Sequence, residues 1–192
     1  MQKIVVLLMG LALALAACAA EAEPIELTQS IDGTLFDTEV SVMYPEGWFF
    51  DVPEGENVIR IASREDALGP AAPARRTGDV SGGITLLPLD ALGAYDLEAD
   101  DSVTAVARAL ADALMENTQN TIMGSPTSFD VNDRRGAVVR GAAQGDGSEG
   151  QVAIAIIQTE SAYGVVTLGT FGDNFDVVVA AQSIVETLTI SE

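Results

Sequence analysis

Short alternations of hydrophobic and polar residues run through most of the chain, with the two-residue period of strands that bury one face. In the first half this pattern predicts strands at 25–31, 39–44, 48–51, 58–62 and 84–89. In the second half it predicts strands at 127–131, 136–144, 151–159, 163–171 and 188–190, with turns at 145–150 and 161–162. Many short strands joined by turns indicate an antiparallel sheet.

The segment Tyr44-Pro45-Glu46-Gly47 has the composition of a tight turn. Proline at the second position presets φ, and glycine at the fourth suits a type I turn. We therefore expect the flanking strands to form a hairpin, with Trp48 packed inward.

Two segments have a helical period instead. Val103, Val106, Leu110 and Leu114 recur at steps of three and four, behind Asp101 or Ser102 as the cap. The segment 174–186 combines strand propensity in its three consecutive valines with helical spacing of its apolar residues, behind Asp173 as the cap. We expect helices at both places, each packing one face on the sheet.

The longest irregular connection is expected at 63–82. Glycine and proline recur there at Gly69, Pro70, Pro73 and Gly78, beside three arginines.

The first 17 residues have the pattern of a secretory signal peptide, in which Lys3 precedes an apolar run at 4–16. The run is shorter than the roughly 20 residues that span a bilayer. Leu15-Ala16-Ala17-Cys18 resembles the lipobox of bacterial lipoproteins, which implies cleavage between Ala17 and Cys18 and lipid on the Cys18 sulfur. The alternative is an ordinary cleaved leader that leaves Cys18 as a free thiol. We expect a signal peptide at 1–17, the lipidated cysteine and a tether at 18–24, and one domain at 25–192.

The predicted mature chain is strongly acidic. Lys3 is the only lysine, so residues 18–192 carry 8 arginines against 29 acidic residues, a formal charge of −21. Such a surface repels nucleic acid phosphates and excludes nucleic acid binding. It serves solubility, or else attracts cations or basic partners.

Few catalytic groups are available. The chain has no histidine, no lysine after Lys3 and no cysteine besides Cys18, which excludes the usual nucleophile–base pairs and disfavours zinc, copper and haem sites. A carboxylate-pair hydrolase remains as a third hypothesis, although Asp37-Thr38-Glu39 lacks the glycine of the aspartic protease loop.

Two acidic segments are candidate calcium sites, because calcium prefers oxygen ligands. One contains Asp146 and Glu149, and the other contains Asp96, Glu98, Asp100 and Asp101. The alternatives are a solvated turn for the first and charges that complement a helix dipole for the second.

Two arginine doublets, Arg75-Arg76 and Arg134-Arg135, are candidate contacts for an anion. The alternative is that these arginines pair with neighbouring acids.

Residues 42–48, Val-Met-Tyr-Pro-Glu-Gly-Trp, and the closing segment 182–190 are similar to the opening turn and final helix and strand of the PsbP-like superfamily, which includes DcrB-like envelope proteins. This resemblance implies an α+β fold, a curved antiparallel β-sheet with two main helices packed on it. It also implies a small envelope lipoprotein without enzymatic activity.

We therefore expect a lipid-anchored protein of the cell envelope, on the periplasmic or extracellular face, that binds a protein partner and needs no cofactor. The alternative is a lipoprotein that binds Ca²⁺ or a small ligand.

Overall fold

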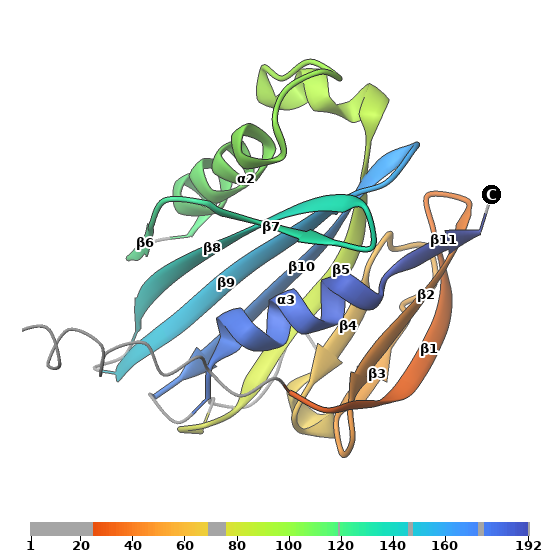
Figure 1. Ribbon diagram of the computed structural model, residues 1–192. Helices are drawn as coiled ribbons and strands as arrows, with labels where there is room; N and C mark the ends of the chain where they lie inside the picture. The colour runs from red at the N-terminus through yellow and green to blue at the C-terminus, as the bar shows by residue number, and fades with distance from the viewer. Residues whose placement is uncertain (1–24, 69–75, 119, 146–147, 173–174, 192) are drawn as a thin grey trace, which may run out of the picture.

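The computed structural model describes residues 25–68, 76–118, 120–145, 148–172 and 175–191. They form an α+β fold of antiparallel strands, as predicted (Figure 1). The strands form two sheets, whereas we expected one. The larger has eight strands in the order β3-β4-β5-β10-β9-β8-β6, with β7 also paired to β8, and the smaller has the order β1-β2-β11.

The three-stranded sheet consists of β1 (Leu27–Leu35), β2 (Thr38–Pro45) and β11 (Thr189–Ser191). The eight-stranded sheet consists of β3 (Phe49–Asp51), β4 (Ile59–Ala62), β5 (Val80–Pro88), β6 (Thr121–Met123), β7 (Thr127–Val131), β8 (Arg134–Gly145), β9 (Ser148–Gln158) and β10 (Ala162–Phe171). The helices are α2 (Val103–Asn117) and α3 (Val177–Thr187), with short 3-10 helices η1 (Glu65–Ala67) and η2 (Leu89–Tyr95).

The eight-stranded sheet buries both of its faces. Along β9, Ala155 and Ile157 belong to one core, whereas Ile154 and Ile156 belong to the other, because successive side chains point to opposite faces. The core with Ala155 is covered by α3 and the three-stranded sheet, and the other is covered by α2 (Figure 1). The two helices therefore lie on opposite faces of the sheet.

Both helices begin at a side-chain cap. The hydroxyl of Ser102 accepts a hydrogen bond from the N–H of Ala105, which confirms one of the two predicted caps of α2. The carboxylate of Asp176 accepts from the N–H groups of Val178 and Val179. Because Asp176 captures these free donors, α3 begins at Val177, three residues later than predicted. The predicted cap, Asp173, lies outside the described residues.

The turn after β2 differs from the prediction. The N–H of Trp48 donates to the carbonyl of Pro45 (3.3 Å), and Gly47 has φ +77°, so Gly47 is the third residue of a type II turn. The predicted hairpin is wrong, because β2 pairs with β1 and β11 while β3 pairs with β4. The turn carries the chain from the small sheet to the large one, and Trp48 packs half-buried against Phe175 (ring centroids 5.7 Å apart).

The predicted loop 63–82 is shorter in the structure, because β5 already begins at Val80. The carboxylate of Asp79, next to this strand, accepts from the N–H of Arg76 (2.8 Å) and pairs with the guanidinium of Arg64 (3.0 Å). Strand β6 and helices η1 and η2 were not predicted; the β6 segment is only three residues long, too short for a periodic signal.

Candidate functional site: the groove beside β11

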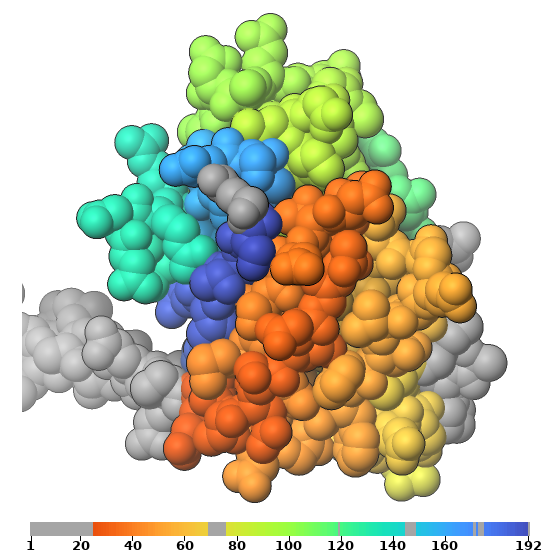
Figure 2. Space-filling model, turned by 90° about the vertical axis from the view of Figure 1, so that its right-hand side faces the viewer, coloured from red at the N-terminus to blue at the C-terminus, as the bar shows by residue number. Residues whose placement is uncertain are grey.

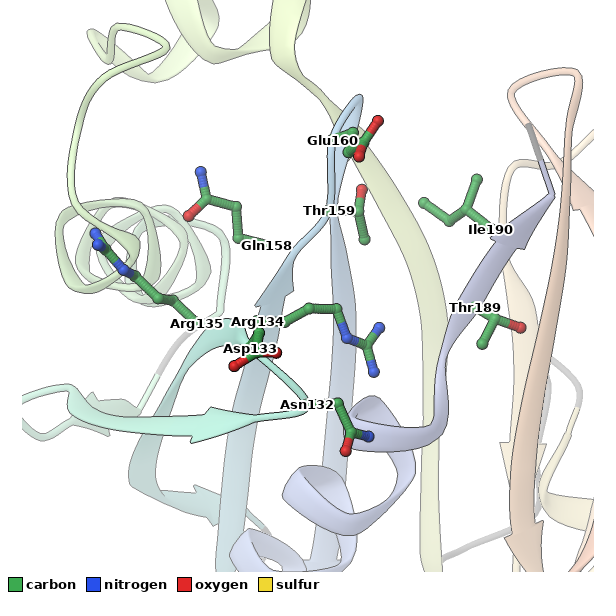
Figure 3. A pocket seen from close by; sticks show the side chains of 9 residues that line it. All are labelled: Asn132, Asp133, Arg134, Arg135, Gln158, Thr159, Glu160, Thr189 and Ile190. Atoms are coloured by element: carbon green, nitrogen blue, oxygen red, sulfur yellow. The ribbon is translucent and has the colours of Figure 1, made fainter.

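An open groove of about 760 Å³ lies between β11 and the two hairpins β7–β8 and β9–β10 (Figure 3). We call it the β11 groove. It is lined by Asn132, Asp133, Arg134, Arg135, Gln158, Thr159, Glu160, Thr189 and Ile190.

Tight turns hold two walls of the β11 groove. Asn132 and Asp133 form the two-residue connection of the β7–β8 hairpin, and both have positive φ (49° and 63°), as in a type I′ turn. In the β9–β10 hairpin, the N–H and the hydroxyl of Thr159 both lie within hydrogen-bond distance of the carbonyl of Ala162 (2.9 and 2.7 Å). The walls are therefore fixed by backbone hydrogen bonding.

Arg134 holds the C-terminal end of α3. Its Nη1 donates to the carbonyl of Leu188 (2.6 Å), and its Nη2 donates to the carbonyl of Glu186 (2.7 Å). A cation is favourable there because the last carbonyls of a helix carry partial negative charge. The guanidinium of Arg134 is thus committed to positioning α3.

Arg135 faces the other way. Successive side chains on a strand point to opposite faces, and in Figure 3 the side chain of Arg135 extends away from that of Arg134. Arg135 is exposed, and within the described part of the chain it has no ion-pair partner. The two guanidinium groups of this doublet do not converge on one point.

The fourth side of the groove is a strand edge. Within the described residues β11 pairs with β2 alone, and Thr189 and Ile190 of β11 line the groove. The backbone groups on the other edge of β11 therefore have no strand beside them, and an unpaired edge is a template for another extended chain.

The structure describes one residue of the second arginine doublet. Arg75 lies outside the described residues, and Arg76 is exposed, with its backbone N–H bonded to Asp79.

The predicted calcium ligands at 96–101, which the structure describes, do not form a metal-binding group. Asp146 lies outside the described residues, and Glu149 is exposed. Of the other segment, Asp96, Glu98 and Asp100 are exposed, while the carboxylate of Asp101 accepts from the N–H of Glu98 (2.8 Å). Within the described ranges no group of three or more acidic, histidine or cysteine residues could hold a metal ion.

The predicted lipidation and cleavage residues, Cys18 and Ala17, lie outside the described residues. In the part of the chain that the structure describes, no helix is long and apolar enough to span a bilayer.

One buried ionisable group lies under α2. Tyr163 is fully buried, and its hydroxyl has no hydrogen-bond partner in the described region. Burial raises the pKa of Tyr163, with a smaller contribution from the carboxylate of Asp101.

No family model and no curated protein matches the sequence. Among solved structures, the chain is similar to CyanoP, the PsbP of the cyanobacterium Synechocystis, with a TM-score of 0.51 and 12% identity over 90% of this chain and 99% of that one. The fold is PsbP-like.

LpqN of Mycobacterium tuberculosis, a protein involved in cell envelope biogenesis, shares this PsbP-like fold with a TM-score of 0.50 and 14% identity over 85% of this chain and 91% of that one. A structure from Bacteroides thetaiotaomicron has a TM-score of 0.45 at 13% identity. The match covers 80% of this chain and 45% of the longer Bacteroides chain. At these identities the similarity concerns the fold, which does not determine function.

Most of the groove residues were not predicted from the sequence. Gln158, Thr159, Glu160, Thr189 and Ile190 are ordinary strand and turn residues that the PsbP-like fold brings together.

Proposed function

We propose that this protein is an exported lipoprotein of the cell envelope that acts without catalysis, by binding an extended segment of a partner protein in the β11 groove. The observation that carries the proposal is the free edge of β11 along a groove of about 760 Å³. One residue of extended chain occupies roughly 3.3 Å along the strand, roughly 4.8 Å between strands and roughly 10 Å between layers. The volume of the groove therefore suits about five residues of extended chain. Addition of a strand to an exposed sheet edge is a common mode of peptide recognition.

The rim of the groove offers charges of both signs, Arg135 and Asp133 on one wall and Glu160 on the other. Such charges would select the register of a bound peptide, and their reversal would place like charges against it and lower the affinity. The resemblance of residues 15–18 to a lipobox and the likeness to LpqN support a place in the envelope.

A hydrolytic role has less support. Asp79 is the buried carboxylate of the described residues, and the guanidinium of Arg64 neutralises it where a hydrolase would need a second carboxyl group.

Site-directed crosslinking tests the proposal. If Cys18 carries lipid, a cysteine introduced at Thr189 is the only free thiol and accepts a photoactivatable crosslinker. A Thr28→Cys variant is the matched control, since Thr28 is exposed on β1 of the same sheet. In native membranes we expect one discrete product from the position in the groove and not from the control.

The purified partner should then bind the wild-type protein, and the double variant Arg135→Glu/Glu160→Arg should weaken binding at least tenfold. No product, identical products from both positions, or unchanged affinity of the double variant would refute binding in the groove.

A further inference from the structure

Two phenylalanines stand exposed on an edge strand of the large sheet. All three residues of β3 are exposed, with Phe49 at 40% and Phe50 at 45%. Phe49 pairs in register with Ala62 and Phe50 with Ile61, so the two rings lie on opposite faces of the strand. The ring of Phe50 also packs edge-on against the ring of the buried Tyr44 (ring centroids 5.7 Å apart), and both phenylalanines still keep a large exposed fraction. Clustered exposed apolar side chains mark an interaction surface.

This aromatic edge lies at the end of the molecule where the described chain begins. Leu27, at the start of β1, pairs with Pro45, and Phe49 lies four positions after Pro45. Four steps along the chain span at most about 14 Å. Ile25, Leu27 and Trp48 pack against the same core. Figure 2 shows the three-stranded sheet and the segment that follows it as one continuous face.

The distance from the expected anchor is short. Seven residues lead from Cys18 to Ile25, which span at most about 25 Å when fully extended. A lipid on Cys18 therefore keeps this end of the domain within that distance of the bilayer surface. Tethering raises the effective concentration of membrane around the aromatic edge, so even a weak contact becomes populated.

We propose that Phe49 and Phe50, with Trp48 beside them, insert into the headgroup region of the membrane and orient the domain on it. The proposal rests on the lipid anchor of the proposed function. Aromatic side chains favour the membrane–water interface, and three of them follow one another here.

The charge of the residues around Phe49 and Phe50 indicates which lipid headgroups this surface can contact. Glu46, Asp51 and Glu54 are exposed beside the rings, and Arg60 of the neighbouring strand is paired with Glu56 and Asp51. Anionic headgroups would repel this surface. We therefore assign the contact to zwitterionic lipid.

Trp48 is the only tryptophan of the chain, so all tryptophan fluorescence comes from one position, next to Phe49. The lipidated full-length protein is reconstituted into phosphatidylcholine vesicles in which a fraction of the lipids carries bromine near the headgroup, a short-range quencher. We expect the brominated lipid to quench Trp48, and the variant Phe49→Ser/Phe50→Ser to lose at least half of this quenching. Vesicles with a large fraction of phosphatidylglycerol should give weaker quenching.

The matched control is Ile122→Ser. Ile122 is 73% exposed on β6, at the opposite edge of the large sheet from β3, and its replacement should leave the quenching unchanged. Circular dichroism verifies that each variant is folded.

Two failures are distinguishable. If mass spectrometry finds the lipid on Cys18 and the protein floats with the vesicles, yet Trp48 is not quenched, the membrane contact is refuted and the anchor stands. If Cys18 carries no lipid and the protein does not float, the anchor itself is refuted, and this inference falls with it.

Discussion

The guanidinium of Arg134 donates a hydrogen bond to the carbonyl of Leu188 (2.6 Å), which joins the first residue of β8 to the end of α3 across 54 positions of sequence. The same side chain also reaches the carbonyl of Glu186. The helix is thereby attached to the sheet at its C-terminal end by one charged group.

Replacement of Arg134 by alanine should lower the free energy of unfolding by about 2–3 kcal/mol, because two charge-assisted hydrogen bonds are lost and two carbonyls lose their donor. Arg134→Lys should recover part of the loss. Urea denaturation followed by Trp48 fluorescence measures the change. Arg135→Ala is the control and should cost less than about 0.5 kcal/mol, since Arg135 is exposed. Equal effects of the two alanine variants would contradict the role of Arg134.

The N-terminal end of α3 has its own attachment, since both carboxylate oxygens of Asp176 lie 3.1 Å from Nη2 of Arg140. Asp176→Ala should cost about 1–2 kcal/mol, because the helix cap and the ion pair are both lost. Arg140→Ala should cost less than about 1 kcal/mol, since the pair is partly exposed and screened by solvent. Urea titrations at low and high salt test this: salt should weaken the effect of Arg140→Ala and leave most of that of Asp176→Ala.

The hydroxyl of Tyr163 is buried without a hydrogen-bond partner in the described region, so its removal should stabilise the fold. Tyr163→Phe should raise the free energy of unfolding by about 1 kcal/mol at pH 7, because a buried hydroxyl without a partner is removed.

The same substitution predicts a pH dependence. Because the pKa of Tyr163 is raised in the folded state, the unfolded chain ionises first, and this contribution to stability is lost as pH rises from about 10. The difference between Tyr163→Phe and wild type should therefore grow between pH 9 and pH 11. A difference that stays constant or shrinks in urea titrations over this range would show that Tyr163 ionises freely when folded.

Gly82 permits the close approach of β5 and β10. A Cβ atom at this position would lie 1.9 Å from the carbonyl oxygen of Thr167, a backbone atom that cannot move aside. Gly82→Ala should cost about 3 kcal/mol or prevent folding, in the range of severe overpacking. Gly93→Ala is the control, because no atom lies within 4 Å of its Cβ position. Thermal unfolding by circular dichroism compares the two variants.

The sequence was sufficient for the features that depend on local pattern. The helix α2 follows from the spacing of Val103 and Val106, and both are buried as predicted. Its cap, Ser102, could be predicted because a hydroxyl before an apolar periodic run captures free N–H groups.

The pairing of strands within the sheets could not be predicted from local pattern. Alternation along a predicted strand indicates that the strand has a buried face, and it does not indicate which strand lies beside it. The turn at Pro45 and Gly47 therefore suggested a hairpin, whereas it connects two sheets. The β11 groove was missed for a related reason, because its residues come from three segments far apart in the sequence. The predictions at Cys18, Ala17, Asp146 and Arg75 concern residues outside those described, and they stay predictions.

The two arginines of β8 that hold α3 also fix how long that helix can be. Arg134 and Arg140 are six residues apart on one face of the strand, about 20 Å at the rise of a strand, while the 11 residues of α3 span about 16 Å. Arg134 therefore contacts the C-terminal end of the helix, and Arg140 contacts its N-terminal end. Insertion of a single residue into α3 would turn its apolar face by about 100° and release one arginine from its partner. Variation in length should therefore be confined to the connections outside α3 and β8.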